Sequence, residues 1–366
     1  MSFDHAEFAL KCVAPTNFLL YDDKQMPGVY VYIPKFRLCD VLSTADTSTH
    51  PAFIVDGVEK DGIYIGKFQS KHYDGRAYSR PGEDPTAPAS GAGIDYFVSY
   101  NRAKGGHFHE ITAAEWAAIA LWCHKNGTEP YGNNDYGKDS RETLRVAIPK
   151  TKSSGQTNHV ATGTGPVTWS HDRTMAGIWD MNGNVSEWCT GLRLVKGELQ
   201  VFVNNNAAAP TADLSASSSA WKAINAAATG WDDLYITPDG TGTTTGSVKL
   251  DYVSSAWKWD TTISSSSDSS RNCLFKDITA SANVGDTAKL LLQALALMPD
   301  TSLTGDNIDA SYGNDKLYAN NAADERCLNR GGGWGYGAAG GVFYGYLGYP
   351  RSYSSAYIGG RSASYD

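Results

Sequence analysis

The sequence is poor in charge and has no cluster of basic residues. Only 19% of its 366 residues are Asp, Glu, Lys or Arg, and its formal net charge is -8. Proteins that bind nucleic acid need gathered positive charge to contact the phosphates. We therefore expect no nucleic acid among the partners.

Long apolar runs are missing as well. No stretch approaches the roughly 20 apolar residues that cross a bilayer, so no membrane insertion is expected. The first residues carry Asp4 and Glu7 where a secretory signal needs positive charge, so no signal peptide is predicted. We therefore expect the protein to be made and folded in the cytosol.

Cysteines are few and far apart. None of the six belongs to a C-x-x-C pair, so neither a zinc knuckle nor a disulfide framework is indicated. Buried free thiols are the expected state. With 41% hydrophobic residues the chain can nevertheless bury a full core.

Three early segments have the alternating, β-branched pattern of strands. They are residues 29–38, 54–58 and 62–68, with a charged turn at 59–61 between the last two. Residues 79–93 are rich in Pro, Gly and Ser, and residues 131–139 in turn formers, so both predict surface loops.

Residues 112–126 give the strongest prediction of a helix. Thr112 and Glu115 have the spacing of a capping box, and Gly127 ends the run. One face is apolar and should pack on the sheet, through Trp116, Ile119, Ala120 and Cys123. A second helix is predicted at 286–298, ended by Pro299.

Residues 177–188, GIWDMNGNVSEW, contain an Asn-Gly turn signal, and Trp179, Val185 and Trp188 supply bulk to bury. Beyond Lys196 the character changes to Ser, Thr, Ala and Asn, with a few tryptophans as anchors. This stretch, to about residue 325, predicts a long insertion of short strands and loops, because its polar runs could not fill a large core alone.

The last segment, residues 330–366, holds about a third of all tyrosines and contains no Lys, Glu, Gln, Met, Asn or Thr. Tyrosine among Gly, Ser and Ala is the composition of antibody-type binding loops. The alternative is a low-complexity tail without a fixed fold. Regularly placed apolar residues and arginines favour a folded binding surface.

Several motifs occur together in one order: YIPKF, FIVDGVEKDGIYIGKF, TAAEW, GIWDMNGNVSEW and the terminal RGGGW…GGRSA. In this they resemble proteins with the C-type lectin fold of the formylglycine-generating-enzyme (sulfatase-modifying-factor) type. The ending looks like the variable region of a diversity-generating retroelement target protein. The resemblance covers most of the chain outside the insertion.

The resemblance implies an α+β fold of antiparallel strands with two main helices and much irregular loop. Residues 1–28 would form an N-terminal segment and residues 29–366 the lectin-like domain, with the insertion at about 196–325 and the variable region at 330–366. In such variable regions, template asparagine codons are mutated at adenines, which never yields Lys, Glu, Gln, Met or Trp. The stretch after Trp334 contains none of the five.

The resemblance also sorts the residues of this segment. Constant scaffold positions would be Trp334, Val342, Phe343, Leu347, Arg351, Ser352, Ile358, Arg361 and Ser362. Variable, ligand-binding positions would be Gly335, Tyr336, Ala339, Tyr344, Tyr346, Gly348, Tyr349, Tyr353, Ser355, Ala356 and Tyr357. Gly340 and Gly345 stay unassigned.

Catalytic relatives of this kind use copper-binding cysteines after the RGG motif or an H-x-x-x-H-x-E triad. The chain has no cysteine in 330–366, and His107 and His109 have the wrong spacing for the triad, so we interpret them as surface or hydrogen-bonded residues. Calcium at the oxygen-rich residues 180–187 stays an open alternative to a polar turn. No catalytic residue, cofactor or metal is assigned.

We therefore expect a hypervariable receptor-binding protein that is not an enzyme. Its partner would be a protein or glycan on a target cell surface. The protein itself would be located at a phage tail tip or on a cell surface, and it could form an oligomer. The alternatives are a non-canonical enzyme of the formylglycine-generating-enzyme superfamily and a structural virion protein.

Overall fold

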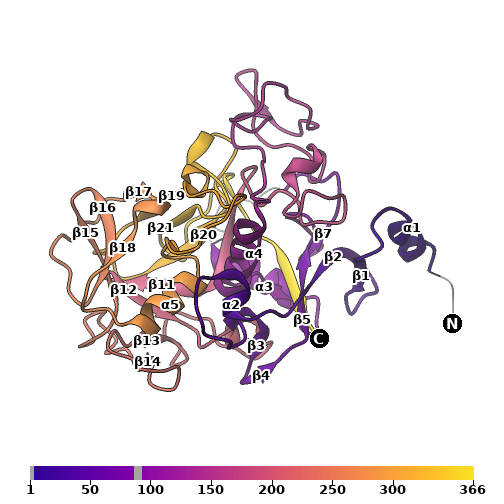
Figure 1. The fold of residues 1–366 in the computed structure, drawn as a ribbon. Coiled ribbons are helices and arrows are strands. Elements are labelled where there is room, and N and C mark those ends of the chain that lie inside the picture. Colours follow the sequence, from indigo (N-terminus) through magenta and orange to yellow (C-terminus); the bar gives the residue numbers. More distant parts are fainter. Residues whose placement is uncertain (1–3, 86–92) are drawn as a thin grey trace.

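The computed structural model describes residues 4–85 and 93–366. Within these ranges it is a mixed α+β structure, mostly strands, with much loop and five α-helices, which confirms the predicted class at this level. The helices are α1 (His5–Val13), α2 (Leu38–Val41), α3 (Ile94–Arg102), α4 (Ala113–Asn126) and α5 (Asp286–Ala294). In Figure 1, α1 and β1 lie at the edge of the molecule and α4 near its centre.

A five-stranded sheet brings the beginning and the end of the chain together. Its order is β1-β2-β5-β23-β8, and every neighbouring pair is antiparallel. The strands are β1 (Asn17–Tyr21), β2 (Pro27–Pro34), β5 (Gly62–Gly66), β23 (Ser362–Tyr365) and β8 (His109–Glu110). The last residues of the chain are therefore held between two earlier strands.

A twelve-stranded sheet forms the other half of the fold, with the path β17-β19-β21-β20-β11-β12-β15-β16-β18 and β13, β14 and β22 beside it. Its strands are β11 (Ser186–Val195), β12 (Glu198–Val201), β13 (Lys222–Ile224), β14 (Tyr235–Ile236), β15 (Lys249–Val253), β16 (Ala256–Asp260), β17 (Arg271–Leu274), β18 (Thr279–Ala280), β19 (Lys316–Ala319), β20 (Arg326–Arg330), β21 (Gly345–Tyr349) and β22 (Ile358–Gly359). Three hairpins complete the strands: β3 (Ile54–Val55) with β4 (Val58–Glu59), β6 (Ser70–Tyr73) with β7 (Arg76–Ser79), and β9 (Lys152–Ser153) with β10 (Gln156–Thr157).

Helix α4 forms as predicted. The Thr112 side chain accepts the N–H of Glu115, the Glu115 side chain accepts that of Thr112, and Gly127 ends the helix in the left-handed conformation. The predicted apolar face is buried, and α4 contacts β11. The same hydrophobic core includes Trp257 and Trp259, so the polar segment 196–325 packs its short strands onto a core shared with the rest of the chain.

Several predicted boundaries are wrong. Strand β2 ends at Pro34, and Leu38 already begins α2. The predicted strand at 54–58 is a hairpin that turns at Asp56 and Gly57, both at positive φ, and Glu59, expected in a turn, lies in β4. The predicted loop at 79–93 begins after β7, and its residues 86–92 lie outside the described ranges.

The second predicted helix is shorter than expected. Helix α5 ends at Ala294, before Pro299, because Ala296 takes a positive φ of 49°. Arg330 then donates to the carbonyl oxygens of Leu295 and Ala296, each at 3.0 Å. A distant arginine therefore satisfies carbonyls that the end of the helix leaves without a backbone partner.

All six cysteines are free, and Cys123, Cys189, Cys273 and Cys327 are buried as predicted. The prediction of burial is wrong for Cys12, which is exposed on α1, and for Cys39, which is only partly buried. Among the helices at 4–85 and 93–366, none has the length and apolarity needed to cross a membrane.

Candidate ligand-binding surface

The C-terminal segment is fixed at both ends by buried arginines. The Arg361 guanidinium contacts both carboxylate oxygens of Glu187, at 2.7 and 2.8 Å, and donates to the carbonyls of Gly66 and Trp179. Arg330, at the other end, holds the carbonyls after α5 as described. Both side chains are fully buried, so the segment between them is carried by a rigid support.

Strand β21 presents tyrosines from the middle of this segment. It lies between β19, to which it is parallel, and β20, to which it is antiparallel. Leu347 points into the core and is fully buried, whereas Tyr346 is partly exposed, as strand alternation requires. Tyr346 also hydrogen-bonds through its hydroxyl to the exposed Ser270 at 3.1 Å.

A β-bulge in β21 changes this alternation. Asn329 pairs with Tyr346 and Cys327 pairs with Tyr349, so three steps along β21 correspond to two along β20. The extra residue turns the following side chain to the other face. As a result the Tyr349 ring stacks on that of Tyr346, with centroids 4.2 Å apart.

Six rings form a continuous row, which we call the tyrosine strip. It runs, in spatial order, through Tyr336, Tyr344, Tyr318, Tyr346, Tyr349 and Tyr353. Successive centroids are 5.2, 5.9, 5.7, 4.2 and 3.7 Å apart, within or slightly closer than the usual range of aromatic pairs. The structure thus brings five of the predicted variable tyrosines together.

Tyr318 was not among the predicted site residues. It lies on β19, inside the segment 196–325, and pairs with Tyr346 across the parallel strands. The only local signal is the alternation of β19, in which Leu317 and Ala319 are buried and Tyr318 is partly exposed. That pattern predicts an outward side chain but not its neighbour, because the pairing with β21 is long-range.

A second group of predicted positions lies around Trp334. The buried Trp334 ring stacks on Tyr357, with centroids 3.9 Å apart, and meets His159 edge-on at 4.7 Å. The loop 131–139 supports this turn, since the Trp334 carbonyl accepts the N–H of Tyr136 at 2.8 Å. His159 also contacts the carbonyl oxygen of Ala356 at 3.1 Å, so one buried ring holds both turns.

Exposure follows the predicted division with three exceptions. Exposed positions are Gly335, Ala356 and Tyr357; partly exposed ones are Tyr336, Ala339, Tyr346, Gly348, Tyr349, Tyr353 and Ser355. The expected exposure is wrong for Tyr344, which is buried beneath Tyr336 and Tyr318. Among the expected scaffold positions Ser352 is exposed and Arg351 partly exposed, and the remainder are buried: Trp334, Val342, Phe343, Leu347, Ile358, Arg361 and Ser362.

The strip itself is uncharged. Burial raises the pKa of Tyr336, Tyr344 and Tyr349 above its ordinary value, so their hydroxyls stay neutral at physiological pH. The neighbouring Arg351 is paired with Glu325, at 3.0 and 3.1 Å, and with Asp95, at 2.6 Å. The surface therefore offers rings and hydroxyl groups, with the adjacent charge already neutralised.

The other candidate groups are engaged in hydrogen bonds. His107 stacks on Tyr365 and contacts its carbonyl oxygen, and His109 contacts Glu115 at 2.8 Å, which confirms the interpretation of hydrogen-bonded histidines. Burial raises the pKa of Asp180 to about 6, and its carboxylate accepts the N–H of Gly163. Within 4–85 and 93–366 no group of three or more His, Cys, Asp or Glu side chains is arranged to hold a metal ion.

The chain matches no protein-family model, and a search of the curated proteins finds no match.

Proposed function

We propose that the chain is a ligand-binding protein with the C-type lectin fold of the formylglycine-generating-enzyme type, and that the tyrosine strip is its binding surface. The continuity of the strip carries the proposal. Five of its six rings are partly exposed, and the buried Tyr344 links Tyr336 to the other four. Rigid amphipathic rings of this kind give large contact areas at low entropic cost.

We further propose that a retroelement diversifies the positions around the strip. The composition after Trp334 supports this, and so does the burial pattern. An exposed loop side chain such as that of Ala356 can change without disturbing the core, because surface substitutions usually alter stability by less than about 0.5 kcal/mol. The buried Tyr344 is an exception and is expected to tolerate less.

The partner we propose is a protein or glycan receptor on a target cell, met by the chain at a phage tail tip. Aromatic anchors without free charge give affinity through a few central rings and little electrostatic steering. Binding should therefore depend only weakly on salt. Tyr346 is the central anchor we propose, since it contacts Tyr318, Tyr349 and Ser270.

A pair of variant libraries tests the proposal. The first exchanges only strip and loop positions, namely Tyr336, Tyr346, Tyr349, Tyr353, Ala356 and Tyr357. The matched control exchanges exposed positions in the segment 196–325, namely Ser217, Ser219, Thr245 and Ser266. Both are selected against cell-surface proteins and glycans. Partner choice that changes only in the first library supports the strip.

Affinity measurements then test the strip residue by residue. For a partner obtained from the first library, truncating Tyr346 to Ala should cost about 2 kcal/mol or more, as for other central aromatic anchors. If partner choice follows the control library and Tyr346→Ala binds normally, the binding site lies elsewhere and the proposal fails.

A further inference from the structure

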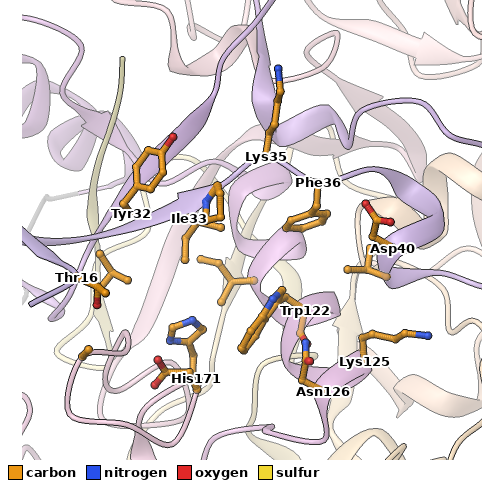
Figure 2. Close-up of a pocket in the computed structure, with 16 residues that line it drawn as sticks. Thr16, Tyr32, Ile33, Lys35, Phe36, Asp40, Trp122, Lys125, Asn126 and His171 are labelled. Atoms are coloured by element: carbon orange, nitrogen blue, oxygen red, sulfur yellow. The ribbon is translucent and has the colours of Figure 1, made fainter. Parts of the chain in front are cut away.

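A groove of about 600 Å³ shares no lining residue with the tyrosine strip and is lined by residues of β2, α2, α4 and the loop 171–176. Its floor contains the buried aliphatic side chains Val31, Ile33 and Ile119, and its walls include partly exposed aromatic rings. Figure 2 shows His171 and Trp122 facing Tyr32, Ile33 and Phe36 across it. Its size and apolar lining are those of small-molecule sites.

His171 supplies a polar group of defined orientation in this groove. Its Nδ1 accepts the N–H of Ile178 at 2.8 Å, and its own backbone N–H donates to the Ile178 carbonyl at 2.8 Å. Burial lowers the pKa of His171 to about 4, so the ring is neutral at pH 7. With Nδ1 accepting, the proton of the neutral ring lies on Nε2.

The Nε2–H group of His171 has no acceptor among the residues the structure describes, and the ring is among those that line the groove. Trp122 lies beside it, with ring centroids 5.2 Å apart. A ligand atom that accepts a hydrogen bond from Nε2 would therefore place an attached aromatic ring against the Trp122 face.

Charges at the rim limit the choice of ligand. Lys35 is paired with Glu59 and Asp61, at 3.5 and 3.4 Å, and Asp40 with Arg37 at 3.0 Å. The Asp172 carboxylate accepts the hydroxyls of Ser170 and Thr174, each at 2.9 Å. In the described chain the exposed ammonium of Lys125 and the Asp172 carboxylate have no ion pair, and because these two charges are opposite in sign, a ligand that is neutral or carries a single charge fits the rim best.

From this geometry we propose that the groove binds a flat aromatic small molecule carrying a carbonyl or carboxylate oxygen, which accepts the His171 Nε2–H while the ring packs on Trp122. The site is separate from the tyrosine strip and does not depend on the function proposed for it.

Two probes of the same shape test this site, naphthalene-2-carboxamide and naphthalene-2-carboxylate, titrated by calorimetry into the full chain. The Nε2 resonance of His171, followed in protein labelled with ¹⁵N-histidine, should shift on addition of either probe. Trp122→Leu should weaken binding about three- to tenfold, as expected for the loss of one aromatic contact. Lys125→Gln should weaken binding of the carboxylate alone, because only that probe carries a charge opposite to the Lys125 ammonium.

Trp231→Leu is the matched control, because Trp231 is also partly buried but does not line this groove. It should leave both affinities unchanged. The proposal is overturned if neither probe binds, if Trp122→Leu and Trp231→Leu have equal effects, or if the His171 resonance stays in place. It is likewise overturned if the chain self-associates in solution and Trp122→Leu makes it monomeric, since a second copy would then be the occupant.

Discussion

Replacing Trp334 by Ala tests the division between scaffold and displayed residues most directly. The side chain is 3% exposed, stacks on Tyr357 and contacts His159 edge-on. Truncating a buried tryptophan removes its burial energy and leaves a cavity, which together cost roughly 3 to 5 kcal/mol. The Trp334→Ala variant should therefore lose that much unfolding free energy.

Tyr357→Ala is the matched control on the other side of the same stack. Tyr357 is 45% exposed, so its truncation opens little cavity and removes mainly the ring contact, about 0.5 to 1.5 kcal/mol. Urea denaturation followed by circular dichroism, with an unchanged m-value, measures both losses. The double variant Trp334→Ala/Tyr357→Ala gives the coupling free energy between the two rings, which should equal the ring-contact energy of about 0.5 to 1.5 kcal/mol.

Equal losses for the two single variants would refute the division, because the structure places one ring in the core and the other at the surface. A coupling near zero would refute the stacked geometry alone and leave the burial of Trp334 in place.

Three further predictions concern the support of the site. Glu187→Ala leaves the fully buried Arg361 without its carboxylate and should cost about 3 to 5 kcal/mol in chemical denaturation, clearly more than Asp61→Ala, whose partner Lys35 is exposed and retains Glu59. Burial lowers the pKa of His50 to about 4, so below pH 6.5 the native ring stays neutral while the ring of the unfolded chain takes up a proton. The contribution of His50 to the free energy of unfolding is therefore complete above about pH 6.5. It is lost as the pH falls towards 4, by at most about 1.4 kcal/mol per pH unit. Asp180, whose pKa is raised to about 6, changes the stability in the opposite direction in the same pH range, so the wild type must be compared with His50→Gln. Between pH 6.5 and 4.5, the slope of the unfolding free energy against pH should be shallower in His50→Gln than in the wild type. Equal slopes would contradict a neutral buried His50. Because no metal-binding group is arranged among residues 4–85 and 93–366, a chelator should change the melting temperature by less than about 1 °C. If the native state did bind a metal, removal of that metal by the chelator would lower the melting temperature.

Local patterns in the sequence were sufficient for elements whose signals lie within a few residues. The capping box and apolar spacing of 112–126 predicted α4 from Thr112 to Gly127, because helix caps and helical faces depend on neighbours at most a turn or two away. The burial of Trp179, Val185 and Trp188 followed in the same way from side-chain size and a turn signal. The composition of 330–366 identified the segment that carries most of the tyrosine strip.

The arrangement within that strip was decided by tertiary structure. The bulge that turns Tyr349 towards Tyr346 arises from the pairing of β21 with β20, and Tyr318 enters from β19 through a parallel pairing. Such pairings join residues that are far apart in the chain, and no local periodicity specifies them. The burial of Tyr344 and the early end of α5 have the same origin, since each depends on side chains that only the folded chain brings into contact.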